Sequence, residues 1–233
     1  YGSWNPLLSP SWSPNGQQLA FVSFGDQGSV VQIMQLNTGQ HEIVASFQGI
    51  NTAPAWSPDG RMLAYSTSRH GSPDVYIYDT VTKQHTRVST HYGIDTEPAW
   101  SPDGKSLLYT SNRTGKAQIY STQVGSDSSD RITFDGDENA NASYDFDGKR
   151  LTMVTDGGQI AVMDEETSRI TMLTNAKFDE SPSFSPNGDM VLYATQDRYQ
   201  PALMVASSDG RIRTRLEFIY GDVREPAWSP IRN

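Results

Sequence analysis

The sequence predicts an all-β fold, a β-propeller of four-stranded antiparallel blades, and two observations support this prediction. An eight-residue unit recurs along the chain, most clearly at residues 53–60 (APAWSPDG) and 97–104 (EPAWSPDG). Its aromatic residue recurs at intervals of 44, 44, 44, 40 and 44 residues, at Trp12, Trp56, Trp100, Tyr144, Phe184 and Trp228. A period this regular indicates stacked structural units, and about 44 residues suit one WD40-like propeller blade.

Each unit contains signals for four strands. The proline of the unit cannot donate to a ladder, so it marks the beginning of a first strand. Ser-Pro-Asp-Gly then predicts a tight turn, because Pro presets φ and Gly accepts the last position. Alternating apolar residues predict the next two strands, as at Leu63 and Tyr65 and then at Val75 and Ile77. A short polar strand around Val88 completes the second unit.

The same pattern divides the whole chain, residues 1–233, into blades of one domain that begin near residues 9, 53, 97, 141 and 181. The fourth unit diverges most, because Ala142 and Phe146 replace its prolines, yet it keeps the Asp-Gly turn. Residues 225–230 repeat only a first strand. We therefore expect a six-bladed parent protein, with five complete blades here and a terminal strand that closes the sixth blade with strands from upstream of Tyr1. A five-bladed ring with a redundant terminal strand is the alternative.

Composition excludes several classes of function. The net charge of −9 argues against nucleic acid, whose phosphates would repel the chain. No apolar run approaches the roughly 18 residues of a membrane helix, so we expect no direct membrane insertion. The absence of cysteine excludes disulfides and fits the cytosol and the bacterial periplasm about equally. We expect a monomer.

The sequence offers little catalytic chemistry. It contains no Gly-x-Ser-x-Gly motif, and its four histidines fall at four different places in the repeat: His41, His70, His85 and His91. We therefore predict no enzyme, no metal centre and no cofactor. Carboxylates that point into a propeller tunnel could hold Ca²⁺ through oxygen ligands, and this remains a minor hypothesis.

The loops before the first strands are the best candidate for a binding surface. In a propeller these loops surround the entrance of the central tunnel, and a rigid scaffold commonly carries its binding residues on such loops. Acidic residues predominate in them, and Ile50, Ile94 and Phe178 offer apolar anchors. We interpret the recurring aromatics as structural wedges that pack between neighbouring blades. A residue that recurs at the same position in every unit usually serves packing rather than ligand binding.

The full pattern, xPxWSPDG followed by Leu-x-Tyr and Ile-Tyr strands, resembles the propeller domain of the TolB family over residues 8–230. Three stretches carry the resemblance beyond propellers in general: residues 96–98 (TEP), 179–183 (DESPS) and 226–230 (PAWSP). Similar units also occur in propellers of prolyl oligopeptidase-type peptidases and of oligogalacturonate lyases. The resemblance implies that the chain lacks the family's N-terminal α/β domain.

The resemblance also implies a function: a periplasmic, non-enzymatic interaction scaffold of the Tol–Pal system, which supports outer-membrane integrity, cell division and protein transport. It implies binding of the lipoprotein Pal, or of a colicin segment, at the tunnel mouth, and binding of TolA through a segment missing here. The partner-binding positions that it implies are Ile50, Asn51, Thr52, Ala53, Asp95, Thr96, Glu97, Asn139, Asn141, Asp179 and Glu180. An accessory propeller of a peptidase and a propeller-fold sugar lyase are the alternatives.

Overall fold

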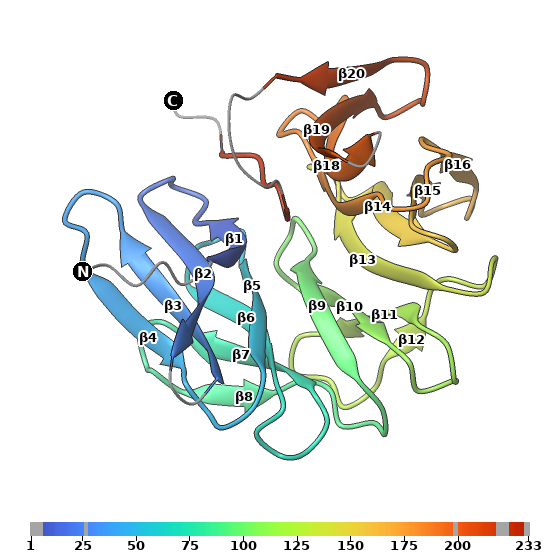
Figure 1. Cartoon of the computed structure of the whole chain (residues 1–233). Coiled ribbons are helices and arrows are strands. Elements are labelled where there is room, and N and C mark those ends of the chain that lie inside the picture. Colours follow the sequence, from blue (N-terminus) through green and yellow to red (C-terminus); the bar gives the residue numbers. More distant parts are fainter. Residues whose placement is uncertain (1–6, 26–27, 198–199, 218–223, 231–233) are drawn as a thin grey trace.

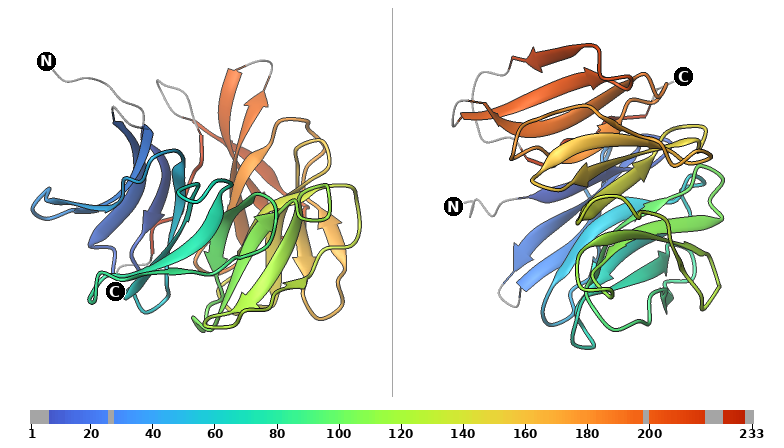
Figure 2. Two further views of the ribbon diagram at one scale, coloured as in Figure 1. Left: turned by 90° about the horizontal axis from the view of Figure 1, so that it is seen from below. Right: turned by 90° about the vertical axis from the view of Figure 1, so that its right-hand side faces the viewer.

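The computed structural model describes residues 7–25, 28–197, 200–217 and 224–230. In this part of the chain it shows twenty strands and no helix. The strands form five four-stranded antiparallel sheets that follow one another around a central axis (Figure 1). Two further views show each sheet turned relative to the one before it (Figure 2). The predicted class, a β-propeller with four-stranded blades, is confirmed.

Every blade runs in chain order from an inner strand at the axis to an outer strand at the rim. The first blade comprises β1 (Leu8–Trp12), β2 (Gln18–Gly25), β3 (Gly28–Gln35) and β4 (His41–Ala45). The second comprises β5 (Asn51–Trp56), β6 (Met62–Thr67), β7 (Asp74–Asp79) and β8 (His85–Arg87). The third comprises β9 (Asp95–Trp100), β10 (Ser106–Ser111), β11 (Gln118–Gln123) and β12 (Asp130–Arg131).

The last two blades follow the same order. The fourth comprises β13 (Asn139–Tyr144), β14 (Arg150–Thr155), β15 (Gln159–Asp164) and β16 (Ile170–Met172). The fifth comprises β17 (Glu180–Phe184), β18 (Met190–Asp197), β19 (Gln200–Ser207) and β20 (Arg213–Leu216). The inner strand of each blade therefore begins within two residues of the position that the repeat predicts.

The Ser-Pro-Asp-Gly turns form as the sequence predicts, and they also join neighbouring blades. Ser57 Oγ donates to Asp59 Oδ1 (2.5 Å), and the Gly60 amide donates to the Ser57 carbonyl (2.9 Å). Gly60 has a φ of +72°, and a Cβ there would lie 3.5 Å from Pro14 of the preceding blade. The turn of the third blade meets Pro58 in the same way. The proline of one turn thus packs on the glycine of the next turn.

The hydrophobic core lies between blades. One cluster joins Val31 of the first blade to Leu63 of the second, and another joins Ile77 of the second blade to Trp100 of the third. Similar clusters join the third blade to the fourth and the fourth to the fifth. A blade therefore buries its apolar faces only against its neighbours, which is the expected behaviour of a repeat architecture.

Residues 224–230 occupy a sixth inner position, between the first blade and the fifth (Figure 1). Trp228 Nε1 donates to the Ser183 carbonyl (3.1 Å), which repeats the bond from Trp100 Nε1 to the Ala55 carbonyl (3.0 Å). The predicted terminal strand, 225–230, is nevertheless not a strand here, because no described residue pairs with it in a ladder. The number of blades in the parent protein stays a prediction.

The inner-strand tryptophans offer a matched test of packing between blades. Trp56 and Trp100 are 8% and 9% exposed, so Trp56→Ala and Trp100→Ala should each lower the free energy of unfolding by about 3–5 kcal/mol. Of these two residues, Trp100 alone uses its indole N–H to bind the preceding blade, since Trp56 Nε1 has no partner. Trp100→Phe should therefore cost about 1 kcal/mol more than Trp56→Phe, measured by urea unfolding. Equal losses in the two Phe variants would contradict this account.

Candidate functional site: the central tunnel and its mouth

The inner strands share an unusual backbone feature three residues before each recurring aromatic. The residue at this position has a φ between 48° and 55° in all six units, at Ser9, Ala53, Glu97, Asn141, Ser181 and Glu225. Non-glycine residues seldom adopt this left-handed conformation. The ladder shifts register at the same place, as between Thr52 and Ala55, which marks a β-bulge. The bulge recurs in all five paired inner strands. All six of the left-handed residues line the central cavity.

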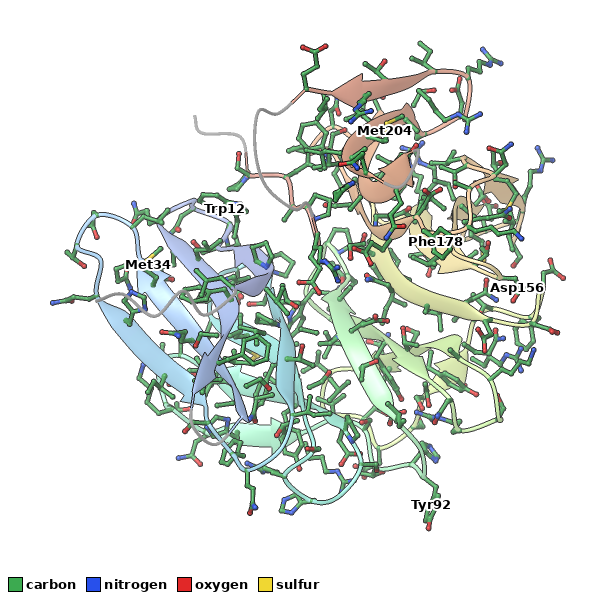
Figure 3. The ribbon with its side chains drawn as sticks, viewed as in Figure 1. Trp12, Met34, Tyr92, Asp156, Phe178 and Met204 are labelled. Atoms are coloured by element: carbon green, nitrogen blue, oxygen red, sulfur yellow. The ribbon has the colours of Figure 1, made fainter. Side chains whose placement is uncertain are left out.

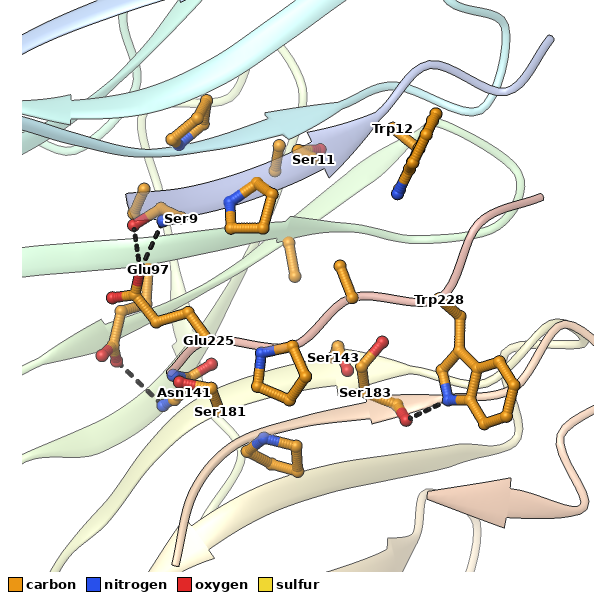
Figure 4. A pocket seen from close by; sticks show the side chains of 18 of the residues that line it. Ser9, Ser11, Trp12, Glu97, Asn141, Ser143, Ser181, Ser183, Glu225 and Trp228 are labelled. Atoms are coloured by element: carbon orange, nitrogen blue, oxygen red, sulfur yellow. Dashed lines mark hydrogen bonds between the residues drawn. The ribbon is translucent and has the colours of Figure 1, made fainter. Parts of the chain in front are cut away.

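The cavity is the tunnel of the propeller, with a volume of about 610 Å³. Its wall comes from the six inner segments, including 225–230 (Figure 4). Thr52 and Thr96 also line it, above the left-handed residues in the direction of the strand starts. The tunnel wall is therefore mixed. It contains hydroxyl groups, prolines, small side chains and the aromatic rings of Trp12, Phe184 and Trp228, together with the two carboxylates of Glu97 and Glu225.

These two carboxylates each bind the next unit of the ring. Glu97 Oε2 accepts hydrogen bonds from Thr110 Oγ1 (2.7 Å) and from the Asn141 amide (2.9 Å). Glu225 Oε2 accepts hydrogen bonds from the amide of Ser9 and from Ser9 Oγ (3.2 Å) (Figure 4). Desolvation raises the pKa of Glu97, and the negative charge of Glu225 raises it further, while the bonds from Thr110 and Asn141 oppose this rise.

The first residue of the inner strands β5, β9 and β13, and the residue just before β17, are buried rather than open to the mouth. These residues are Asn51, Asp95, Asn139 and Asp179, which are 0–3% exposed. Asn51 Nδ2 donates to the carbonyls of Phe47 (2.6 Å) and Ser29 (2.8 Å), so it fixes the loop that leads into its strand. Asn139 Nδ2 donates to the Asp135 carbonyl (2.8 Å) in the same way.

The two aspartates at this position bind side chains of their own blades. Asp95 forms an ion pair with Arg113 (3.5 Å), and Asp179 accepts a hydrogen bond from Thr195 Oγ1. All four are positions at which the resemblance implies binding of a partner, and their side chains are buried in this structure. The two asparagines thus hold the entrance loops, while the two aspartates bind side chains within their own blades.

The residue just before the buried one is exposed at the mouth. Ile50, Ile94 and Phe178 are 50%, 47% and 64% exposed, and Glu138 takes the same place in the fourth blade. Their backbone is held in place, because the Ile50 amide donates to Ser68 Oγ (2.8 Å) and the Ile94 amide to Asn112 Oδ1 (2.7 Å). The mouth therefore presents apolar side chains on a rigid base.

Two features of the mouth were missed by the sequence interpretation. Tyr92, beside Ile94, is 99% exposed and projects away from the ring (Figure 3). Its position outside the repeated register left it without a signal. Glu225 was not among the predicted contact residues, although its place in EPAW matches that of Glu97 and could have identified it.

The eleven predicted partner-binding residues thus fall into three groups. Ile50 and Glu180 are exposed at the mouth. Five others line the tunnel: Thr52, Ala53, Thr96, Glu97 and Asn141. The remaining four, Asn51, Asp95, Asn139 and Asp179, are the buried anchors. Contact with a partner stays a prediction for all three groups.

The described part of the chain shows no group of three or more His, Cys, Asp or Glu side chains placed to hold a metal ion. The suggestion of Ca²⁺ in the tunnel stays a prediction. Within the same residues, no helix has the length and apolar character needed to cross a membrane.

Comparisons with known proteins agree with this architecture. The family model described as the TolB beta propeller domain matches residues 1–232. The Tol-Pal system protein TolB of Xanthomonas oryzae pv. oryzae (strain PXO99A) is 62% identical over 232 residues, covering 97% of this chain and 53% of that protein. The chain therefore spans about half the length of this relative.

Solved structures give the same result. The crystal structure of TolB from Acinetobacter baumannii has a TM-score of 0.92 and 41% identity, covering 99% of this chain and 59% of that one. A putative TolB from Agrobacterium tumefaciens has a TM-score of 0.81 at 23% identity, covering 99% and 87%, and this likeness shows the fold alone.

The raised pKa of Glu97 predicts how the thermal stability of the protein depends on pH. Because its pKa is raised in the folded protein, the folded state binds its proton up to a higher pH than the unfolded chain does. Its contribution to stability is therefore full below the unfolded pKa and is lost as pH rises through the folded pKa. Glu97→Gln imitates the protonated form, so it should raise the Tm at pH 7 by on the order of 3 °C.

This gain should shrink as the pH falls below the unfolded pKa, where the wild-type side chain is itself protonated. Glu166→Gln, at an exposed turn, is the matched control and should leave the Tm unchanged at both pH values. Thermal unfolding at pH 7 and at pH 3.5 measures the effect. A gain that is constant with pH would refute the assignment to Glu97.

Proposed function

The chain belongs to the TolB β-propeller family, and from this we propose that it is a non-catalytic interaction module of the Tol–Pal system that binds Pal at the tunnel mouth. The relatives at about 60% identity are named as Tol-Pal system proteins. Their name supports a partner within that system for this chain too. From the resemblance to the family we further propose a place in the periplasm. The proposed interaction needs no cofactor.

The observation that carries the proposal is the form of the mouth. Ile50, Ile94 and Phe178 lie exposed at equivalent positions around the tunnel entrance. Tyr92 adds an exposed aromatic ring beside Ile94. Apolar and aromatic side chains on a fixed backbone are the usual anchors of a protein interface, because they lose little conformational entropy on binding. The carboxylates around them add a polar rim of negative charge.

The proposal extends to the wider role of the family. We propose that the module helps to couple the outer membrane to the inner-membrane machinery, and so supports membrane integrity, cell division and protein transport. Contact with TolA would come from a segment outside this chain. A disordered colicin segment would compete for the same mouth. These three proposals follow from the resemblance to the family. The geometry of the mouth supports the contact with Pal.

Substitution at the mouth provides the direct test. Ile94→Glu and Phe178→Glu should each weaken binding of purified Pal by about tenfold, because each removes an apolar anchor and places a charge in the interface. The matched control is Val81→Glu, which changes a side chain that is 73% exposed. Val81 lies in the turn between β7 and β8, at the opposite end of the strands from the mouth.

Calorimetric titration of Pal into each variant measures the effect, and circular dichroism verifies the fold. Wild-type affinity in both mouth variants would exclude this face. Loss of binding in the Val81 variant alone would move the interface to the other end of the tunnel.

A further inference from the structure

The outer strand of the fifth blade, β20, differs from the other outer strands of the described chain. All four residues of β20 are exposed, whereas β4, β8, β12 and β16 each contain buried or half-buried residues. β20 is also the last strand of its sheet, paired only with β19 among the strands of the structure. Among the described residues no strand pairs with its outer edge, so this edge offers backbone N–H and C=O groups for pairing.

Arginines recur at every second residue along this edge, at Arg211, Arg213 and Arg215. Since side chains alternate between the two faces of a strand, Arg213 and Arg215 lie on one face of β20. Arg211 lies in the turn just before the strand. Arg211 pairs with exposed Asp209 of its own turn (3.3 Å), and Arg213 bonds to Asn175 Oδ1 (3.4 Å). Both contacts are long and solvent-exposed, so they hold these side chains only weakly.

A basic row on an open edge selects what can pair with it. A second copy of β20 in antiparallel pairing would place arginine opposite arginine, which is unfavourable. A strand with acidic residues at every second position would instead place carboxylates next to guanidinium groups while its backbone completes the ladder. The chain as a whole has a net charge of −9, so an acidic strand is repelled by the protein in general. The basic row makes this edge a favourable place for such a strand to pair.

We propose that β20 is a second interaction surface, which binds an extended acidic peptide segment of a partner protein by strand addition. The segment pairs with the free edge of the fifth blade, and its alternate carboxylates contact Arg211 and Arg213. This surface lies at the rim of the ring, away from the tunnel mouth (Figure 1). A partner at the mouth and a partner at this edge can therefore bind at the same time.

The test uses a fluorescein-labelled octapeptide in which Glu alternates with Thr, and fluorescence anisotropy as the readout. The peptide should bind the wild-type chain, and Arg211→Glu combined with Arg213→Glu should weaken that binding by about tenfold. The matched control combines Lys105→Glu with Arg169→Glu, the same change of charge at two exposed cations on other blades. The control should stay within about twofold of the wild type.

Three further peptides separate strand addition from charge attraction alone. One carries the same four Glu residues in a single block. The other two keep the alternating sequence and carry N-methyl groups on every second amide, one peptide along each of its two edges. Both the block peptide and one of the two methylated peptides should bind about tenfold more weakly. Hydrogen exchange of the β20 amides should slow only with the alternating peptide. Pal capture should be unchanged in the Arg211/Arg213 variant, so the two surfaces are tested separately.

Several outcomes would overturn the proposal. They are equal binding of the block and alternating peptides, equal loss in the Lys105/Arg169 control, or no protection of β20. Binding of anionic lipid vesicles that depends on Arg211 and Arg213, without binding of the peptide, would assign the edge to a membrane surface instead.

Discussion

Packing between neighbouring blades is the interaction on which the rest of this structure depends. The core clusters each take residues from two adjacent blades, as where Ile77 of one blade meets Leu107 of the next. A single sheet of four short strands has no second layer of its own, so its apolar faces are buried only when neighbours cover them. This requirement fixes the angle of each blade, and the angle in turn sets the width of the tunnel and the position of every entrance loop.

The entrance loops show how a repeat can carry a specific surface without loss of stability. At the start of the inner strand in the second to fifth blades, a buried Asn or Asp binds backbone or side-chain groups of the structure around it, and the residue before it is exposed. The buried residue varies little, between Asn51 and Asp95 for example, whereas the exposed one ranges from Ile94 to Glu138. Recognition therefore resides in side chains that the core does not need.

Much of the fold was predictable because its signals are local. Turn chemistry at Ser57 to Gly60 and alternation at Leu63 and Tyr65 depend on neighbouring residues alone. The site was less predictable. The bulge at Ala53 adds one residue to the inner strand, so the alternation of side chains changes phase there. The sequence pattern alone therefore does not predict that the side chain of Asn51 is buried. The pairing of Glu225 with Ser9 joins opposite ends of the chain, and no local pattern encodes such a contact.

The contact at Glu225 shows that closure of the ring uses a bond already present elsewhere in the repeat. The bulge gives Asn141 and Ser9 a left-handed conformation, and the amide of each meets a carboxylate from the unit before it. Both carboxylates stand at the same place in the same four residues, EPAW. Their position in a narrow tunnel is costly for two negative charges, as the raised pKa of Glu97 indicates, yet each satisfies a backbone donor that the bulge has freed. The terminal segment therefore needs no interaction of a new kind to bind the first blade. Because it repeats the unit, it also repeats the hydrogen bond from a backbone amide to a carboxylate that joins one unit to the next.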